Sequence, residues 1–217
     1  MTIKTISAKI DSRLNKSASK DYDNIWNWQK AEAFNKGILE WVRRQKRGKN
    51  TTQEGDEETD SRIDDLQVLI VKKTLNLRDK KDYYESDKLP ADYLFYKRLS
   101  VNASKDNCYN IPLISHLREV ANVDQYKYFP SFEMEETFHT ISSNRIQIYK
   151  SDFIIDRAEL TYYRLPKKYS FKDLNEVVEF KDDVCELLVD EAVKILASDI
   201  ESVNQKVLSQ ERGEFNN

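Results

Sequence analysis

Glycine is scarce in this chain of 217 residues, and its distribution excludes a common kind of nucleotide site. The four glycines, Gly37, Gly48, Gly55 and Gly213, lie far apart in the sequence. A phosphate-binding loop needs closely spaced glycines, because its backbone N–H groups must approach the anion. The sequence therefore indicates neither a GxGxxG nor a GxxxxGK loop, and we expect no cofactor.

Histidine and cysteine are equally scarce, with two residues of each. A Ser–His or Cys–His catalytic pair needs His116 or His139 as its base, and no local signature places either beside Cys108. Cys108 and Cys185 match neither a zinc signature nor a CxxC redox motif, so we interpret both as reduced thiols in the core. We therefore predict no catalytic residues, no metal ligands and no enzymatic activity.

Long hydrophobic runs are missing as well. No stretch approaches the roughly 20 apolar residues of a membrane span, and residues 1–20 lack the apolar centre of a signal peptide, so we expect no membrane partner. Hydrophobic residues make up 39% of the chain and charged residues 34%, with a net charge of -3. Typical chains are about 45–50% apolar and about 25% charged, so this protein has much polar surface. Arms, an elongated shape, subunit interfaces or a polar monomer with tails would each produce that balance.

Two long helices are predicted from apolar residues that recur every three or four positions. The first is expected over residues 22–47, where basic residues and Gly48 mark the C-terminal end. The second is expected over residues 182–209, with acidic residues in its first turn. The apolar positions are Ile25, Trp28, Ala31, Phe34, Ile38 and Trp41 in the first helix and Val184, Leu188, Ala192, Ile195, Ile200, Val203 and Val207 in the second.

Three segments contain little to bury, and we predict that they are flexible. Residues 1–20 are expected to form a polar N-terminal arm, although three isoleucines in it have a helical spacing that could dock on a partner. Residues 49–62 are expected to form a mobile acidic loop, and residues 210–217 a frayed tail. Between the arm and the tail, residues 21–209 are expected to form a single α+β domain.

The centre of the chain, about residues 66–166, is predicted to be β-rich and antiparallel. Thr137–Ile141 and Arg145–Tyr149 alternate apolar and polar residues around a short polar turn, which indicates a hairpin. Ala158–Arg164 is expected to add a third strand, because three strands with one apolar face are stable where a lone hairpin is not. The sequence leaves open whether these strands form a meander or part of a closed barrel. The order of the elements indicates an α+β fold in which two long helices flank this region.

Shorter elements of the centre are less regular. Leu66–Val71 fits either a buried strand or the end of a helix, and Arg98–Ala103 alternates as a strand does. Short helices are expected at Leu89–Tyr96, where Pro90 suits a first helical position, and at Ile111–Val120, whose apolar residues have helical spacing.

The most concentrated charge is a basic cluster at the end of the first predicted helix, over residues 43–49. Arg43, Arg44, Lys46 and Arg47 could contact the phosphates of a nucleic acid or serve as an interface. Alternatively, they complement the helix dipole or pair with the acidic loop of the same or a neighbouring subunit. A basic footprint over the whole chain is absent, because the net charge is negative.

Four strings of the sequence resemble a known family of virion proteins. They are Leu89–Tyr93, with the sequence Leu-Pro-Ala-Asp-Tyr, Phe132–Thr137 before the predicted hairpin, Ala158–Pro166 in the third strand and Leu187–Val193 in the last helix. Together with the aromatic stripe of the first helix, they resemble the tail ring and head–tail connector, or adaptor, proteins of tailed bacteriophages, particularly short-tailed crAss-like phages. The resemblance covers about residues 22–205.

The resemblance implies a structural virion protein that forms a ring of about twelve copies, stacked below the portal and surrounding the DNA channel. It implies portal or neighbouring tail ring proteins as partners and viral DNA that passes without specific binding. It also implies a place at the head–tail junction of the virion, after assembly in the host cytoplasm. No functional residues come with it. The alternative, which rests on the basic cluster, is a non-enzymatic accessory protein that binds nucleic acid.

Overall fold

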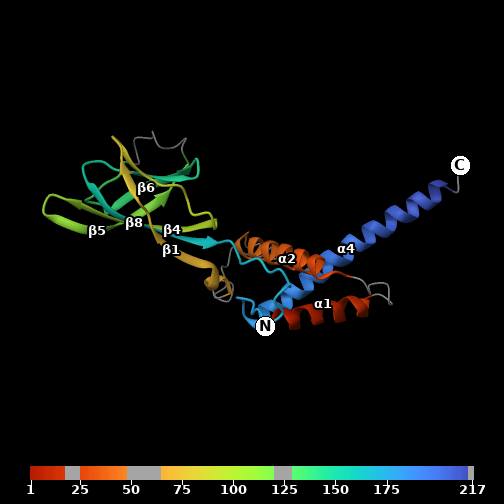
Figure 1. Ribbon diagram of the computed structural model, residues 1–217. Helices are drawn as coiled ribbons and strands as arrows, with labels where there is room; N and C mark the ends of the chain where they lie inside the picture. Colours follow the sequence, from red (N-terminus) through yellow and green to blue (C-terminus); the bar gives the residue numbers. More distant parts are fainter. Residues whose placement is uncertain (18–24, 48–64, 120–128, 215–217) are drawn as a thin grey trace, which may run out of the picture. The chain divides into compact units, whose positions relative to one another are not determined.

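The chain divides into two compact units (Figure 1). Unit 1 combines residues 1–68 and 166–217, and unit 2 is the continuous segment Leu69–Leu165 between them. This division replaces the single domain that we expected over residues 21–209. The computed structural model describes residues 1–17, 25–47, 65–119 and 129–214. The acidic loop predicted at residues 49–62 therefore lies outside the described residues.

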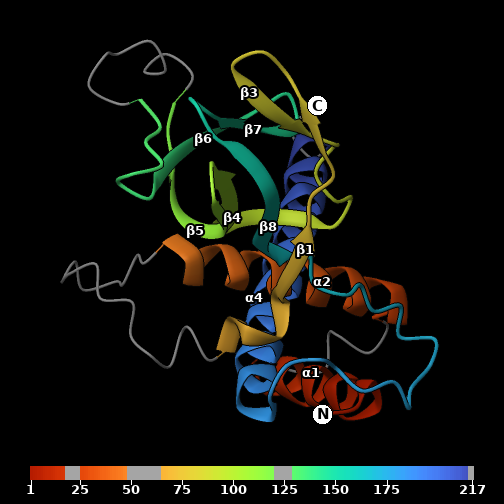
Figure 2. The ribbon, with the colours of Figure 1, turned by 90° about the vertical axis from the view of Figure 1, so that its left-hand side faces the viewer.

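The described part of unit 1 is mainly helical. It contains α1 (Ile3–Ser17), α2 (Asn27–Arg47) and α4 (Asp182–Glu214). Both α1 and α2 pack against α4, as Figure 2 shows. The two long helices predicted from the sequence are present, but α2 begins at Asn27 and not at residue 22, and α4 is longer than predicted. The tail that we expected to fray from residue 210 is helical as far as Glu214.

Helix α1 occupies most of the segment that we predicted to be a flexible arm, so that prediction was wrong for residues 3–17. Its apolar side chains form one stripe that is almost fully buried. They are Ile3, Ile6, Ile10 and Leu14. On the side facing α4, Lys9 pairs with Glu186, and Arg13 contacts Asp190 at 2.6 Å. Four apolar residues among many polar ones do not by themselves indicate a buried helix. They stabilise the helix here because α4 covers them.

Helices α2 and α4 approach closely at Gly37. A Cβ atom at this position would lie 3.4 Å from Cβ of Glu191, in van der Waals contact, so little room is left for a side chain longer than that of alanine. Farther along α2, the ring of Trp41 meets that of Phe180 edge to face, with 5.7 Å between their centroids. The scarce glycine and the aromatic residues of α2 therefore serve helix packing.

The burial of α1 predicts the effect of truncating its stripe. We expect Ile6→Ala to lower the free energy of unfolding by about 2–5 kcal/mol, because it leaves a cavity against α4. The matched control Lys4→Ala removes an exposed side chain of the same helix and should change stability by no more than about 0.5 kcal/mol. Chemical denaturation followed by circular dichroism measures both. Equal effects would mean that α1 is not docked.

Unit 2 is built on one sheet, which in the described residues has eight strands in the order β1-β8-β4-β5-β6-β7-β3-β2. The strands are β1 (Ile70–Thr74), β2 (Leu77–Asp79), β3 (Tyr83–Ser86), β4 (Tyr93–Lys105), β5 (Cys108–Leu117), β6 (Glu136–Ser142), β7 (Arg145–Tyr149) and β8 (Ile154–Arg164). Their described neighbours pair antiparallel, except that β5 and β6 run parallel. The α+β class is confirmed, but the sheet is mixed and not antiparallel.

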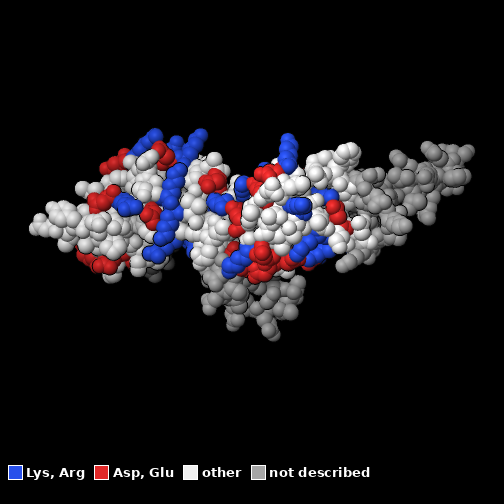
Figure 3. Space-filling view, turned by 60° about the horizontal axis from the view of Figure 1, so that its bottom comes forward, with Lys and Arg blue, Asp and Glu red and all other residues white. Residues whose placement is uncertain are grey.

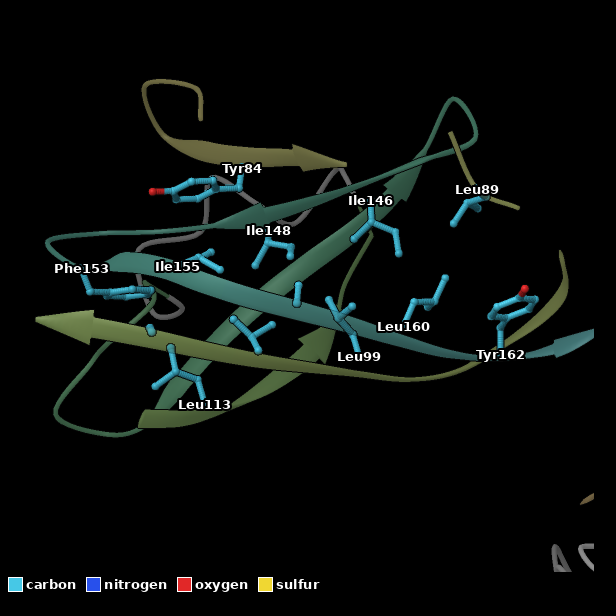
Figure 4. Packing of buried hydrophobic residues seen from close by; sticks show 13 residues of the cluster. Tyr84, Leu89, Leu99, Leu113, Ile146, Ile148, Phe153, Ile155, Leu160 and Tyr162 are labelled. Atoms are coloured by element: carbon cyan, nitrogen blue, oxygen red, sulfur yellow. The ribbon is translucent and has the colours of Figure 1, made fainter. Parts of the chain in front are cut away.

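The sheet curls so that its two edges approach each other. Strands β1 and β2 lie at opposite ends of the strand order, yet only Leu75 and Asn76 separate them in sequence. Even fully extended, the chain from Thr74 to Leu77 spans no more than about 10 Å, so the adjoining ends of the two edge strands must lie close together. The core of unit 2 lies inside the curl, where Leu99, Ile146 and Leu160 point toward one another from different strands (Figure 4).

Two short helices predicted for the centre are strands instead. Residues 89–92 form a turn in which Tyr93 N donates to Pro90 O at 3.0 Å, and β4 begins at Tyr93. The segment predicted as a helix from Ile111 lies in β5 as far as Leu117. Its apolar spacing misled because Leu113 is buried whereas Ile114 and Leu117 are exposed. The strand Arg98–Ala103 is confirmed as part of β4.

The predicted hairpin is confirmed, and of the two arrangements that the sequence left open the meander is excluded. Strands β6 and β7 join through Ser143 and Asn144, which have positive φ angles of 50° and 61°. Two such residues make a turn whose twist suits a hairpin. Strand β8 pairs with β1 and β4 and not with β7, so the three strands do not form a meander. The ambiguous segment Leu66–Val71 contains a short 3-10 helix, Gln67–Leu69, followed by the start of β1.

A core of its own predicts that unit 2 folds alone. We expect an excised fragment of residues 69–165 to unfold cooperatively in urea, because its buried cluster comes from its own strands. Within the fragment, Leu160→Ala should cost about 2–5 kcal/mol, and the exposed control Ile154→Ala less than about 0.5 kcal/mol. A fragment without a cooperative transition would show that unit 2 depends on unit 1.

Candidate functional site

The start of α2 forms an aromatic hollow in unit 1. Trp26 N donates to Gln29 Oε1 at 2.9 Å, and Gln29 N donates back to Trp26 O at 3.0 Å. This reciprocal pair resembles a capping box and holds the entry to the helix. It places two tryptophans at the surface, Trp26 with 68% and Trp28 with 61% of its area exposed.

The opposite wall of the aromatic hollow comes from the segment before α4. Asn35 binds the backbone of Tyr169 twice, because its amide donates to Tyr169 O at 2.8 Å and its carbonyl accepts from Tyr169 N at 2.9 Å. Phe171, with a positive φ of 54°, then packs on Phe34 with 5.8 Å between ring centroids. Packing and hydrogen bonds on both sides make the hollow preformed. Its lining includes Trp26, Trp28, Ser170, Phe171, Lys172 and Leu174.

The aromatic hollow has the chemistry of a protein-binding surface. Tryptophan combines a large apolar area with an N–H donor, and it is enriched among the residues that dominate interfaces. Leu174 is also partly exposed, and Lys172 is the one charged residue of the described lining. The sequence placed Trp28 in the buried stripe of α2, which was wrong. Helical spacing identifies a face, but it does not tell how far along the helix that face is covered.

The basic cluster predicted at residues 43–49 is partly engaged within unit 1. Arg44 Nη1 lies 2.8 Å from Glu191 Oε1 on α4, and this pairing holds the pKa of Glu191 below its usual value. Arg43 and Lys46 are exposed on α2, and the side chain of Arg47 lies outside the described side chains. The structure therefore uses Arg44 to join two helices. Pairing of the cluster with the acidic loop stays a prediction.

The two histidines lie far from the exposed cysteine in unit 2. Cys108 begins β5, and His116 lies near the end of the same strand, about 26 Å away at 3.3 Å per residue. His139 pairs with Leu117 in the neighbouring strand, at that same far end. A Cys–His nucleophile from these residues is therefore excluded. Cys108 is exposed, so our interpretation of it as a core thiol was wrong, whereas Cys185 is buried.

A serine and a histidine do meet inside unit 2. Ser115 Oγ lies 2.7 Å from Nδ1 of His139, and His139 is fully buried. Burial, with a smaller contribution from His116, lowers the pKa of His139 to about 4. Such an imidazole is a weak base near neutral pH, and its Nε2 has no hydrogen-bond partner among the described residues. The pair is therefore a poor nucleophile–base arrangement. Sequence reasoning missed it because Ser115 and His139 are 24 residues apart and share no local motif.

Basic side chains gather on the outer face of β1, β8 and β4. Lys72 and Arg98 lie on either side of Thr161 in the register, and Arg157 pairs with Glu159 at 3.1 Å. Figure 3 shows a row of Lys and Arg on unit 2 with acidic side chains near it. Because β1 is an edge strand, lysine there opposes pairing with other chains. We interpret the row as a solvated, protective face.

Within the described ranges, no group of three or more His, Cys, Asp or Glu side chains could hold a metal ion. Among the helices that the structure describes, none combines the length and the apolar character needed to cross a membrane. No known protein-family model matches the chain, and no curated protein sequence matches it either.

The geometry of the aromatic hollow predicts how the three tryptophans respond to a soluble quencher. We expect iodide to quench the fluorescence of Trp26 and Trp28 strongly and that of Trp41 weakly, because Trp41 is only 3% exposed. The variants Trp26→Phe, Trp28→Phe and Trp41→Phe separate the three contributions. If Trp41→Phe removed most of the quenchable emission, the described exposure of the hollow would be contradicted.

Proposed function

We propose that the chain is a non-enzymatic structural subunit of a phage head–tail connector or tail. In this proposal it assembles with copies of itself into a ring of about twelve subunits around the DNA channel of the virion. Portal or neighbouring tail ring proteins are its further partners, and viral DNA passes without specific binding. The resemblance of the four sequence strings supports the family, and the aromatic hollow supports an assembly role.

The exposed tryptophan pair is the observation that carries the proposal. Large apolar side chains at a preformed hollow on a monomer mark interaction surfaces. Burial of both rings on a neighbouring subunit would contribute about 3–6 kcal/mol before the costs of association. The exposure of two large aromatic side chains has no explanation in the single chain. A stable contact with a neighbouring subunit would explain it.

A ring places a specific demand on this surface. In a head-to-tail ring, each subunit uses one surface to bind the next subunit and a different surface to bind the previous one. The aromatic hollow is one such surface, and we propose that it receives a different surface of the neighbouring copy. The high fraction of charged residues, 34%, suits a subunit whose remaining surface stays in solvent.

The alternative of a nucleic-acid accessory protein receives less support. It relies on the basic cluster at residues 43–49, and Arg44 of that cluster is paired with Glu191. Binding to phosphates would have to compete with this pair. Binding to duplex DNA that weakens steeply with salt would favour the alternative.

Native mass spectrometry of the full chain tests the proposal. We expect the wild type, alone or with candidate portal and ring proteins, to form closed oligomers, and the double variant Trp26→Ala with Trp28→Ala to lose them. The matched control Tyr109→Ala removes an exposed aromatic ring from unit 2 and should still assemble. A wild type that stays monomeric in every mixture would contradict the proposal. A double variant that assembles like the wild type would remove the hollow from it.

A further inference from the structure

The pairing of β5 with β6 is a seam between two halves of the sheet in unit 2. The strands β1, β8, β4 and β5 form one half, and β6, β7, β3 and β2 form the other. The seam is short, since its register covers four residue pairs from Ile114↔Glu136 to Leu117↔His139. By comparison, β4 and β8 pair along ten positions. Parallel pairing is also slightly less stable per residue than antiparallel pairing.

His139 lies on the inner side of this seam. Its Nδ1 is joined to Ser115 Oγ across the seam at 2.7 Å, and its backbone carbonyl accepts a hydrogen bond from Arg118 N at 2.9 Å. The ring of Tyr96 lies on the imidazole, with 5.3 Å between centroids. The side chain is fully buried, and in the described part of the chain its Nε2 has no partner.

A protonated His139 is incompatible with this position. The imidazolium ion carries an N–H at both ring nitrogens, so the Nε2–H would be buried without an acceptor among the described residues. Burial of a charge without a partner costs more free energy than burial of an unpaired neutral polar group. Separation of the two strands would relieve that cost, because water would reach the ring.

We propose that the β5–β6 seam is an acid-sensitive opening point of unit 2, which separates when His139 takes up a proton. Near neutral pH the imidazole is uncharged and the seam is closed. On acidification the two halves of the sheet part at this seam, while the longer β4–β8 pairing stays intact. This property goes beyond the proposed structural role and does not depend on it.

Other ionisable groups near His139 do not reproduce this effect. From β4, Tyr96 stays neutral under acid, since burial raises its pKa. From β5, His116 lies on the outer face with its Nε2 3.9 Å from Glu136, so its protonation would strengthen a contact across the seam. The guanidinium of Arg118 lies over the ring of Phe138, with Cζ 5.1 Å from the ring centre. The residue that β7 pairs opposite His139 is Ile148, which does not ionise.

The sign and size of the pH effect follow from proton binding. Burial lowers the pKa of His139 to about 4 in the closed state, whereas an exposed histidine has a pKa of about 6.5. Between these values the open state binds a proton that the closed state does not bind, so opening becomes more favourable as the pH falls. From pH 7.5 to pH 5 the opening equilibrium should rise roughly 30-fold.

Hydrogen exchange of the full chain, corrected for the intrinsic exchange rates, tests the proposal at single amides. The amides of Ile114 and Arg118 bridge the seam through hydrogen bonds to Glu135 and His139. Their protection should fall roughly 30-fold from pH 7.5 to pH 5 in the wild type. Protection of the amides between β4 and β8 should change much less. A uniform loss across both pairings would overturn the proposal of a local seam.

Two variants separate His139 from its neighbour. His139→Gln keeps a neutral hydrogen-bonding side chain at the seam. It should abolish the roughly 30-fold fall in amide protection between pH 7.5 and pH 5, because glutamine binds no proton in this range. The matched control His116→Gln removes the exposed histidine of the adjacent strand and should keep the change. If His139→Gln kept the acid sensitivity, or if His116→Gln removed it, the proposal would fail.

A titration of the wild type covers the case in which His139→Gln does not fold. The ring resonances of His139, followed by NMR, should titrate well below pH 6.5, and the amide resonances of the seam should change over the same pH range. An ordinary titration of His139 near pH 6.5 would overturn the proposal.

Discussion

The parallel pairing of β5 with β6 is the contact on which the architecture of unit 2 depends. It joins two sets of strands that are otherwise antiparallel, and it brings Ser115 beside His139. The connection of β1 to β2 through two residues then forces the ends of the sheet together. Because the sheet curls, one continuous cluster of apolar side chains is enclosed by strands that are distant in sequence. A buried histidine at this short parallel pairing is a consequence of that enclosure.

Unit 1 depends on a different constraint, which is that α4 serves as the common partner of two shorter helices. Glu186 on α4 binds both Lys9 and Arg13 of α1, and Glu191 binds Arg44 of α2. These pairs are partly exposed and contribute little to stability by themselves, so the apolar stripes supply most of it. The tryptophans at the start of α2 lie outside that coverage. Exposed aromatic area on a helix that is otherwise well packed is the observation on which the proposed assembly role rests.

The predictions from sequence succeeded where a local pattern is enough. The spacing of apolar residues identified α2 and α4, and alternation around Ser143 and Asn144 identified the hairpin of β6 and β7. They failed where the same apolar residues fit both the helical period of about 3.6 and the strand period of about 2. In β5, Leu113, Ile114 and Leu117 have helical spacing, but only Leu113 is buried, and pairing with β4 and β6 decides the conformation. The prediction of a flexible arm failed at residues 3–17 for a related reason. Four apolar residues stabilise a helix only when another helix covers them, and the local sequence does not show that cover.

By itself, the sequence determined the helical periods, the turn between β6 and β7 and the lack of a glycine-rich phosphate loop. These properties depend on residues that are close together in the chain, where spacing and turn chemistry act directly. Only the tertiary structure decided that Trp26 and Trp28 are exposed, that Arg44 reaches Glu191 and that His139 is buried against Ser115. Burial and pairing of this kind are set by neighbours far away in sequence, and a local pattern carries no information about which face such neighbours will cover.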